Sequence, residues 1–240
     1  MKEAFDKYVN NYDLNNKDIK KKYLHSYRVM SLSKKYAQLL GWNKHDIELA
    51  SLIGLLHDIG RFEQLKIYNT FDDSKSIDHA HYGVIELFEK GYIKNFWKNE
   101  KDYEIIKFAI ENHNKYEIEK TNNEKYLKHA KLIRDTDKID ILYLLGSLQN
   151  ATIFADNKGI TEIIKKNFSN NKSIELKDRV TNNDKILANL AYAYNIYNNI
   201  CLEELKRNLI TYINFVDKNH ILDKYFQEIL IYIKKRTKED

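Results

Sequence analysis

Proline is absent from this 240-residue sequence, and glycine occurs only seven times. Because both residues interrupt helices and form tight turns, their scarcity favours long helices and argues against a flexible linker. Asparagine is abundant and provides residues for helix caps and turns instead. No segment shows the alternation typical of a β-strand, so the sequence predicts an all-α fold.

Cysteine is also scarce. Cys201 is the only one, which excludes an intrachain disulfide and a zinc site made of cysteines. The longest apolar stretch, Leu49–Leu56, is far shorter than the ~20 residues that span a bilayer. Segment 1–6 lacks the apolar region of a signal peptide. We therefore expect a soluble cytoplasmic protein with no membrane partner.

The charge of the chain has only a small excess of one sign. Lysine and arginine number 40 against 35 acidic residues, which gives a net charge of +5 spread along the sequence. No zinc-finger spacing or RNA-binding aromatic signature accompanies these residues, so we expect no nucleic-acid partner. The sequence also lacks a glycine-rich phosphate loop and a nucleophile elbow. A positive balance would still help to attract a small anionic substrate.

Helical periodicity and cap residues divide most of the chain into helices. We expect one compact domain over residues 1–240, with a core at 20–145 and a C-terminal helical extension at 146–240 packed on it. Residues 60–77 are predicted to be irregular, and 167–183 is the best candidate for a long loop. The predicted helices cover about 2–11, 17–40, 44–57, 78–90, 100–114, 124–148, 159–168, 183–198, 201–218 and 220–236.

Histidine and aspartate recur on the apolar faces of these helices. At helical spacing, His25, His57, His113 and Asp137 each share a stripe with apolar side chains. A lone histidine on such a face is more often a hydrogen-bonded core residue, and Asp137 could pair with Arg134. Their joint occurrence instead suits a first-row metal, because imidazole and carboxylate together favour Mn, Fe, Co, Ni or Zn.

The dipeptide His57-Asp58 stands at the end of the most apolar of these helices. Burying even a neutral polar group without a partner costs about 2–7 kcal/mol, and a carboxylate costs more. A bound metal ion would compensate for this cost. The pair is therefore the strongest single indication of a metal site in the sequence.

The order His25, His57-Asp58 and Asp137 resembles the H…HD…D pattern of the HD-domain metal-dependent phosphohydrolases. The segments LLHDIGR at 55–61 and RDTDKID at 134–140 are similar to the second and last motifs of that family. The resemblance covers residues 20–145 and implies an all-α, HD-domain-like bundle. It also implies that these four residues bind one divalent metal ion, with Mg compatible as well.

Some members of this family bind two metal ions, and the resemblance then implies further histidine ligands and a bridging role for Asp58. The candidates here are His79 and His113. His81 lies two residues after His79, so a helix turns the two side chains about 200° apart and only one can face the site. We choose His79, because Gly83 one turn later allows a neighbouring helix to pack closely.

The resemblance implies hydrolysis of a phosphoester in a small phosphorylated metabolite, such as a nucleotide, by metal-activated hydroxide. Asp58 is a candidate catalytic residue: either Asp58 or a nearby acid would move the proton to the leaving oxygen, and the sequence does not identify which. Arg61 is a candidate catalytic and phosphate-binding residue, with a surface ion pair to Glu63 as its structural alternative. Lys115 is a weaker candidate for binding phosphate.

Differences from known branches of this family narrow the range of expected substrates. The chain has no proline and therefore lacks the Gly-Tyr-Pro element of the cyclic-di-GMP phosphodiesterases. Arg61 and Phe62 stand where alarmone hydrolases have a Glu-Asp pair. Two alternatives remain open: a catalytically silent HD-type domain that senses a ligand or partner, and a purely structural helical protein. The sequence leaves the oligomeric state open.

Overall fold

The computed structural model describes residues 1–147 and 151–238, and all regular structure among them is helical. The all-α prediction is confirmed. The backbone contacts divide the chain into two compact units, Met1–Thr136 and Asp137–Asp240. The division lies inside a helix, nearer the N-terminus than the predicted end of the core at 145. The grouping of the whole chain into one domain stays a prediction.

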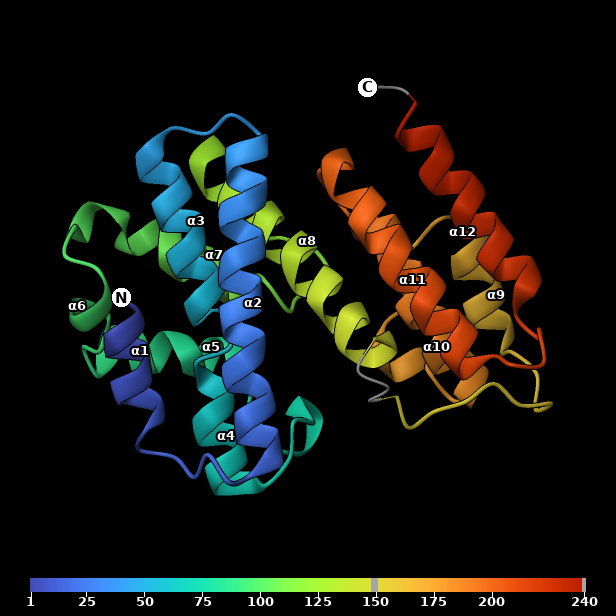
Figure 1. Cartoon of the computed structure of the whole chain (residues 1–240), viewed down its shortest axis with the longest axis horizontal. Helices are drawn as coiled ribbons and strands as arrows, with labels where there is room; N and C mark the ends of the chain where they lie inside the picture. The colour runs from blue at the N-terminus through green and yellow to red at the C-terminus, as the bar shows by residue number, and fades with distance from the viewer. Residues whose placement is uncertain (148–150, 239–240) are drawn as a thin grey trace. The chain divides into compact units, whose positions relative to one another are not determined.

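The first unit contains the N-terminal helices (Figure 1). A π-helical turn, Ile85–Glu89, continues α5, and α8 passes through the division between the units. The helices are α1 (Lys2–Val9), α2 (Lys17–Leu39), α3 (Lys44–Leu56), α4 (Gly60–Tyr68), α5 (His79–Val84), α6 (Ile93–Phe96), α7 (Tyr103–Glu111) and α8 (Glu124–Gly146).

Asparagine begins the two helices at the centre of this unit. The side chain of Asn16 accepts hydrogen bonds from the first turn of α2, and that of Asn43 accepts one from the first turn of α3. The two helices then lie side by side (Figure 1). Gly54 permits this contact, because a Cβ there would lie 2.8 Å from the carbonyl oxygen of Val29. The apolar side chains of α3 are almost all buried in the core.

The second unit contains the end of α8 and four further helices, which are α9 (Glu162–Ser169), α10 (Asn182–Leu190), α11 (Leu202–Val216) and α12 (Asp223–Arg236). Thr181 and Asp184 form a reciprocal capping box at the start of α10. The predicted helix at 183–198 ends earlier, because the chain tightens into a 3₁₀ segment at Ala191–Asn195. The predicted loop at 167–183 is shorter in the structure: residues 170–181 connect α9 and α10 and include a 3₁₀ turn at Leu176–Asp178.

The prediction that residues 60–77 are irregular is wrong, because α4 occupies the first half of that range. Gly60 gives the reason, since the first turn of α4 packs directly on α5. A methyl group on Gly60 would lie 2.2 Å from the carbonyl oxygen of His79 and 2.6 Å from the amide nitrogen of Gly83. A contact between two distant segments therefore favours this helix, and local sequence signals did not reveal it. The short helix α6 was also not predicted.

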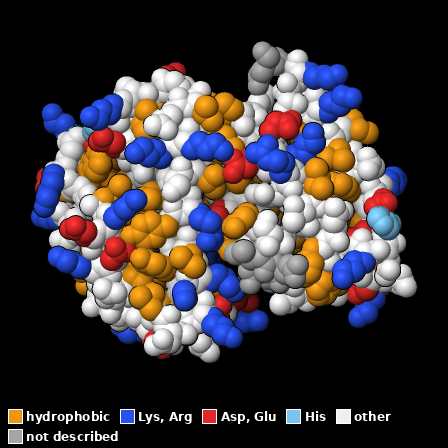
Figure 2. All heavy atoms as spheres, viewed as in Figure 1, with side chains coloured by type: hydrophobic (Ala, Val, Ile, Leu, Met, Phe, Trp, Pro, Cys, Tyr) orange, Lys and Arg blue, Asp and Glu red, His pale blue; other side chains and the backbone are white. Residues whose placement is uncertain are grey.

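Charged side chains of both signs are interspersed with apolar ones on the face of the molecule shown in Figure 2. This distribution agrees with the small and scattered charge excess of the sequence. Within the described residues, every helix is too short or too polar to cross a membrane.

We predict that Gly60→Ala lowers the free energy of unfolding by at least about 1–3 kcal/mol, because the added methyl group meets fixed backbone atoms. Chemical denaturation of the purified protein measures this change. Gly83→Ala is the matched control, since its Cβ comes no closer than 3.4 Å to a neighbouring atom. That variant should stay near the wild type or gain up to about 1 kcal/mol of helix propensity. Equal stability of the two variants would contradict the close packing.

His129 on α8 is a buried histidine. It lies against the ring of Trp42, and its Nε2 is 3.6 Å from Oδ1 of Asp46. Neither nitrogen of His129 has a hydrogen-bond partner within the described part of the chain. Burial lowers the pKa of His129 to about 4, so the ring is neutral at pH 7.

This burial predicts a pH dependence of stability. Between pH 6.5 and about 4 the unfolded chain takes up a proton that the buried ring does not. The contribution of His129 to the free energy of unfolding is therefore fully present above pH 6.5. It falls as the pH decreases toward 4, by up to about 1.4 kcal/mol per pH unit. Urea titrations of chelator-treated protein should show a smaller pH slope for His129→Gln than for the wild type. Identical slopes would mean that His129 does not contribute.

Candidate metal centre

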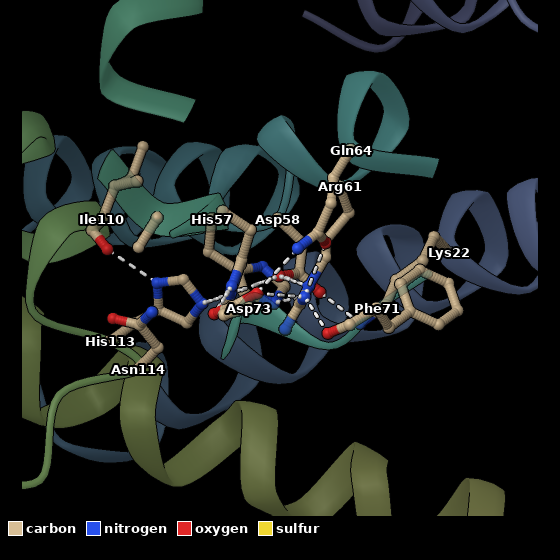
Figure 3. A network of polar contacts seen from close by, with 12 residues as sticks. Lys22, His57, Asp58, Arg61, Gln64, Phe71, Asp73, Ile110, His113 and Asn114 are labelled. Atoms are coloured by element: carbon tan, nitrogen blue, oxygen red, sulfur yellow. Dashed lines mark hydrogen bonds and ion pairs between the residues drawn. The ribbon is translucent and has the colours of Figure 1, made fainter. Parts of the chain in front are cut away.

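Four histidines surround the carboxylate of Asp58, two on each of its oxygens. Oδ2 lies 3.4 Å from Nε2 of His25 and 3.5 Å from Nε2 of His57. Oδ1 lies 3.3 Å from Nε2 of His79 and 3.6 Å from Nε2 of His113. All five residues are buried. The arrangement thus consists of two groups of potential metal ligands that share one carboxylate. Figure 3 shows one histidine of each group, His57 and His113, near Asp58.

Different helices bring these side chains together. His25 lies in the middle of α2, while His57 and Asp58 follow α3 directly. His79 is the first residue of α5, and His113 comes just after α7. Within each group the two imidazoles face each other through Nε2, at 3.2 Å for one pair and 3.1 Å for the other.

Hydrogen bonds at Nδ1 fix the tautomers of the rings. Nδ1 of His57 donates to the carbonyl oxygen of Gly54 at 2.9 Å, and Nδ1 of His113 donates to that of Ile110 at 2.6 Å. In a neutral imidazole the proton on Nδ1 leaves Nε2 with a lone pair. Backbone acceptors of this kind orient the histidine ligands of metal sites.

His79 is oriented in the same way by a carboxylate. Its Nδ1 donates to Oδ2 of Asp73 at 2.6 Å, so in its neutral form Nε2 also carries a lone pair. The Nε2 atoms of His79 and His113 then present two lone pairs to each other at 3.1 Å. Such a pair is stabilised by a cation that both nitrogens bind. The donor set therefore fits a divalent transition metal, for which imidazole and carboxylate are suitable ligands.

The charge states of the site also suit metal binding. Burial lowers the pKa of His113 to about 4, so its ring is neutral, as a metal ligand must be. Burial by itself raises the pKa of Asp58, but the adjacent Lys22 ammonium and His57 outweigh this effect and hold that pKa well below its usual range. Asp58 is therefore ionised at neutral pH. A carboxylate of such low pKa is a good metal ligand, and the part of Asp58 in proton transfer stays a prediction.

Arg61 points inward and supports His79. Its Nη1 donates to Oδ1 of Asp73 at 2.7 Å, to Oε1 of Gln64 at 2.7 Å and to the carbonyl oxygen of Phe71 at 2.6 Å. The other oxygen of Asp73 accepts from His79. The alternative of a surface ion pair between Arg61 and Glu63 is therefore wrong.

A buried arginine holds the segment that carries His113. Arg134 on α8 is only 2% exposed, and its Nη atoms donate to backbone carbonyl oxygens of the loop that follows α7. These acceptors belong to Asn112, His113, Lys115 and Tyr116. The planar fork of a guanidinium is suited to several acceptors at once. The position of His113 thus depends on Arg134.

A further bond connects the two segments that carry His79 and His113. Asp78 caps α5 through its Oδ1, and the same oxygen accepts from Nδ2 of Asn114 at 2.9 Å. His81, in contrast, is exposed and lies 3.2 Å from Glu111, so the structure places His79 rather than His81 in the cluster.

Two further residues, Lys115 and Asp137, were predicted to belong to the site. Among the described residues, Lys115 forms its ion pair with Glu119, at 2.5 Å near the surface, and not with the histidine cluster. Asp137 is half-buried in α8 and is the first residue of the second unit. Its role as a metal ligand stays a prediction.

Sequence reasoning missed two residues that contact the cluster. Lys22 lies one turn before His25 on α2, and its Nζ is 2.5 Å from Oδ2 of Asp58. Its spacing of three residues from His25 suits one face of a helix, but Lys21, four residues before His25, suits it equally, so the spacing does not single out Lys22. Asp73 lies in the segment that was predicted to be irregular, where no periodic pattern identifies it.

Comparison with known families gives one result. A family model described as HD domain matches residues 23–142. The chain belongs to the HD domain family. Comparisons with curated proteins and with solved structures find no significant match. The matched segment of this HD-domain protein contains every residue of the histidine cluster as well as Asp137. Most members of the superfamily are metal-dependent phosphohydrolases.

We predict that Arg134→Gln destabilises the protein by roughly 2–4 kcal/mol, because several buried carbonyl groups lose a charged donor. Urea denaturation measures the loss, and hydrogen exchange should increase most in the loop at 112–119. Arg207→Gln is the control, since Arg207 is exposed on α11. A change within about 0.5 kcal/mol for Arg134→Gln would contradict its anchoring role.

Proposed function

We propose that this HD-domain protein is a metal-dependent phosphohydrolase that cleaves a phosphoester of a small phosphorylated metabolite, and we expect this metabolite to be a nucleotide. The observation that carries the proposal is the division of the four histidines between the two oxygens of Asp58. A carboxylate placed in this way can bridge two cations. Two-metal sites of this kind are widespread in enzymes that hydrolyse phosphate esters.

The ligand sets follow from the distances. His25 and His57 would hold one ion with Oδ2 of Asp58, and His79 and His113 would hold the other with Oδ1. Asp137 is proposed as an additional ligand on the basis of the family motif. The mixture of imidazole and carboxylate suits Mn, Fe, Co, Ni or Zn, and Mg is also compatible with carboxylate ligation. When bound, such ions supply hydroxide at neutral pH and neutralise phosphate charge.

The chain itself contributes orientation and charge. The bonds from Nδ1 of His57, His79 and His113 keep each Nε2 directed toward the cluster. Burial excludes bulk water from the ligands, which strengthens electrostatic interactions within the site. Lys22 and Arg61 place two positive charges beside Asp58, and these favour an anionic substrate.

We predict that the metal-reconstituted wild-type chain contains about two transition-metal ions and releases phosphate from members of a panel of nucleotides and sugar phosphates. His79→Ala should reduce the metal content toward one ion and lower the activity at least about 100-fold, because one ligand group is broken. Elemental analysis and a phosphate-release assay measure the two effects.

His81→Ala is the matched control, because His81 is exposed and lies outside the cluster although only two residues from His79. It should retain both metal and activity. Wild-type protein that binds metal but hydrolyses no phosphoester in the panel would instead support a ligand-sensing domain. Absence of bound metal after reconstitution would favour a purely structural protein.

A further inference from the structure

We propose that Lys22, rather than Arg61, binds the phosphate group of the substrate at this site. The inference rests on the proposed function and adds a substrate-binding residue to it. It follows from a difference between the two cationic side chains beside Asp58. Arg61 is fixed by several partners, whereas Lys22 is held by a single carboxylate.

Lys22 reaches the cluster from α2. Its Nζ lies 2.5 Å from Oδ2 of Asp58, while its side chain remains 17% exposed. The ammonium also lies 5.4 Å from the centre of the Phe71 ring. Lys22 thus connects the buried ligands with the surface, and Figure 3 shows it at one end of the polar network. A substrate that approaches from solvent can meet this ammonium without any rearrangement of the buried histidines.

Arg61 has no comparable freedom. Its Nη1 has three acceptors within 2.7 Å, which belong to Gln64, Phe71 and Asp73. Gln64 in turn donates to Asp73 at 2.8 Å. Nη1 is therefore committed, because moving it to a substrate would break the support of His79 through their shared partner Asp73, while Nε faces Oδ1 of Asp58 at 3.7 Å. Arg61 is therefore a positioning residue for a metal ligand.

Lys22 has a single anionic partner. Among residues 1–147 and 151–238, Asp58 is the only carboxylate within ion-pair distance of its Nζ. That partner is Oδ2, the oxygen that also faces His25 and His57. A cation held by these histidines would share the same oxygen, and its charge would repel the ammonium. The ammonium would then be stabilised by a new anion next to the cluster.

A phosphate group is an anion of suitable charge and position. A substrate phosphate bound at the histidine cluster lies within reach of Lys22, whose flexible stem allows the ammonium to follow it. The Phe71 ring lies next to both cationic groups, at 5.4 Å from the ammonium of Lys22 and 5.6 Å from the guanidinium of Arg61. Lys22 would thus contribute a charge-assisted hydrogen bond to the substrate.

The test compares Lys22→Met with Lys21→Met in the metal-reconstituted full chain. Lys21 is the adjacent control, because it is exposed and pairs with Asp18 at 3.2 Å. Titration with inorganic phosphate, followed by calorimetry, gives the dissociation constant, and elemental analysis gives the metal content. Kinetics on the phosphoester identified in the panel give KM and kcat.

We expect Lys22→Met to weaken phosphate binding and raise KM by about tenfold, with no loss of bound metal. Lys21→Met should match the wild type in all three measurements. Arg61→Met should lower the metal content, because His79 loses its support. Lys22→Arg should recover part of the phosphate affinity.

The outcomes separate this inference from the proposed function. Wild-type protein that binds phosphate through Lys22 but hydrolyses nothing would support the inference and refute the function. Hydrolysis with unchanged phosphate affinity and KM in Lys22→Met would overturn the inference and leave the function intact. Failure of the metal-loaded wild type to bind phosphate, or metal loss in Lys22→Met, would also overturn it.

Discussion

The charge of Asp58 is the constraint around which the first unit is organised. A carboxylate with almost no exposure must be compensated from several directions, because an isolated buried charge is very unfavourable. Helices α2, α5 and α7 each bring or precede one histidine near it, and α3 carries another beside it. The relative placement of these helices is therefore a condition for burying this one group as well as for building the site.

Close backbone contacts make that placement precise. Gly54 brings α3 against α2, and Gly60 brings α4 against α5. Each of these contacts lies within one turn of a histidine of the cluster or of its support. A sequence with so few glycines uses two of them to place helices beside potential metal ligands. The packing of the core and the geometry of the site therefore depend on the same positions.

Helical periodicity was sufficient to predict the all-α fold and the buried positions of His25, His57 and His113. The choice of His79 over His81 also agrees with the structure, since a helix directs the two rings to different sides. The family match at 23–142 is close to the segment 20–145 over which the motifs were recognised.

The remaining features depend on contacts between distant segments, which one sequence does not reveal. α4 forms where its first turn packs on α5, and Asp73 acquires its role only because His79 and Arg61 both reach it. Lys22 sits within a run of three lysines, and nothing in that run distinguishes the inward one from its solvated neighbours. For Asp137 the sequence motif is the stronger guide. The motif identifies it as a candidate ligand, and in the structure it is the first residue of the second unit.

The bond between Asp78 and Asn114 has a consequence for the site before any cation binds. It joins the residues immediately next to His79 and His113, so the protein itself holds these two candidate ligands near each other. Donors that are already placed lose less conformational freedom on binding. This half of the site would therefore be preorganised for a cation.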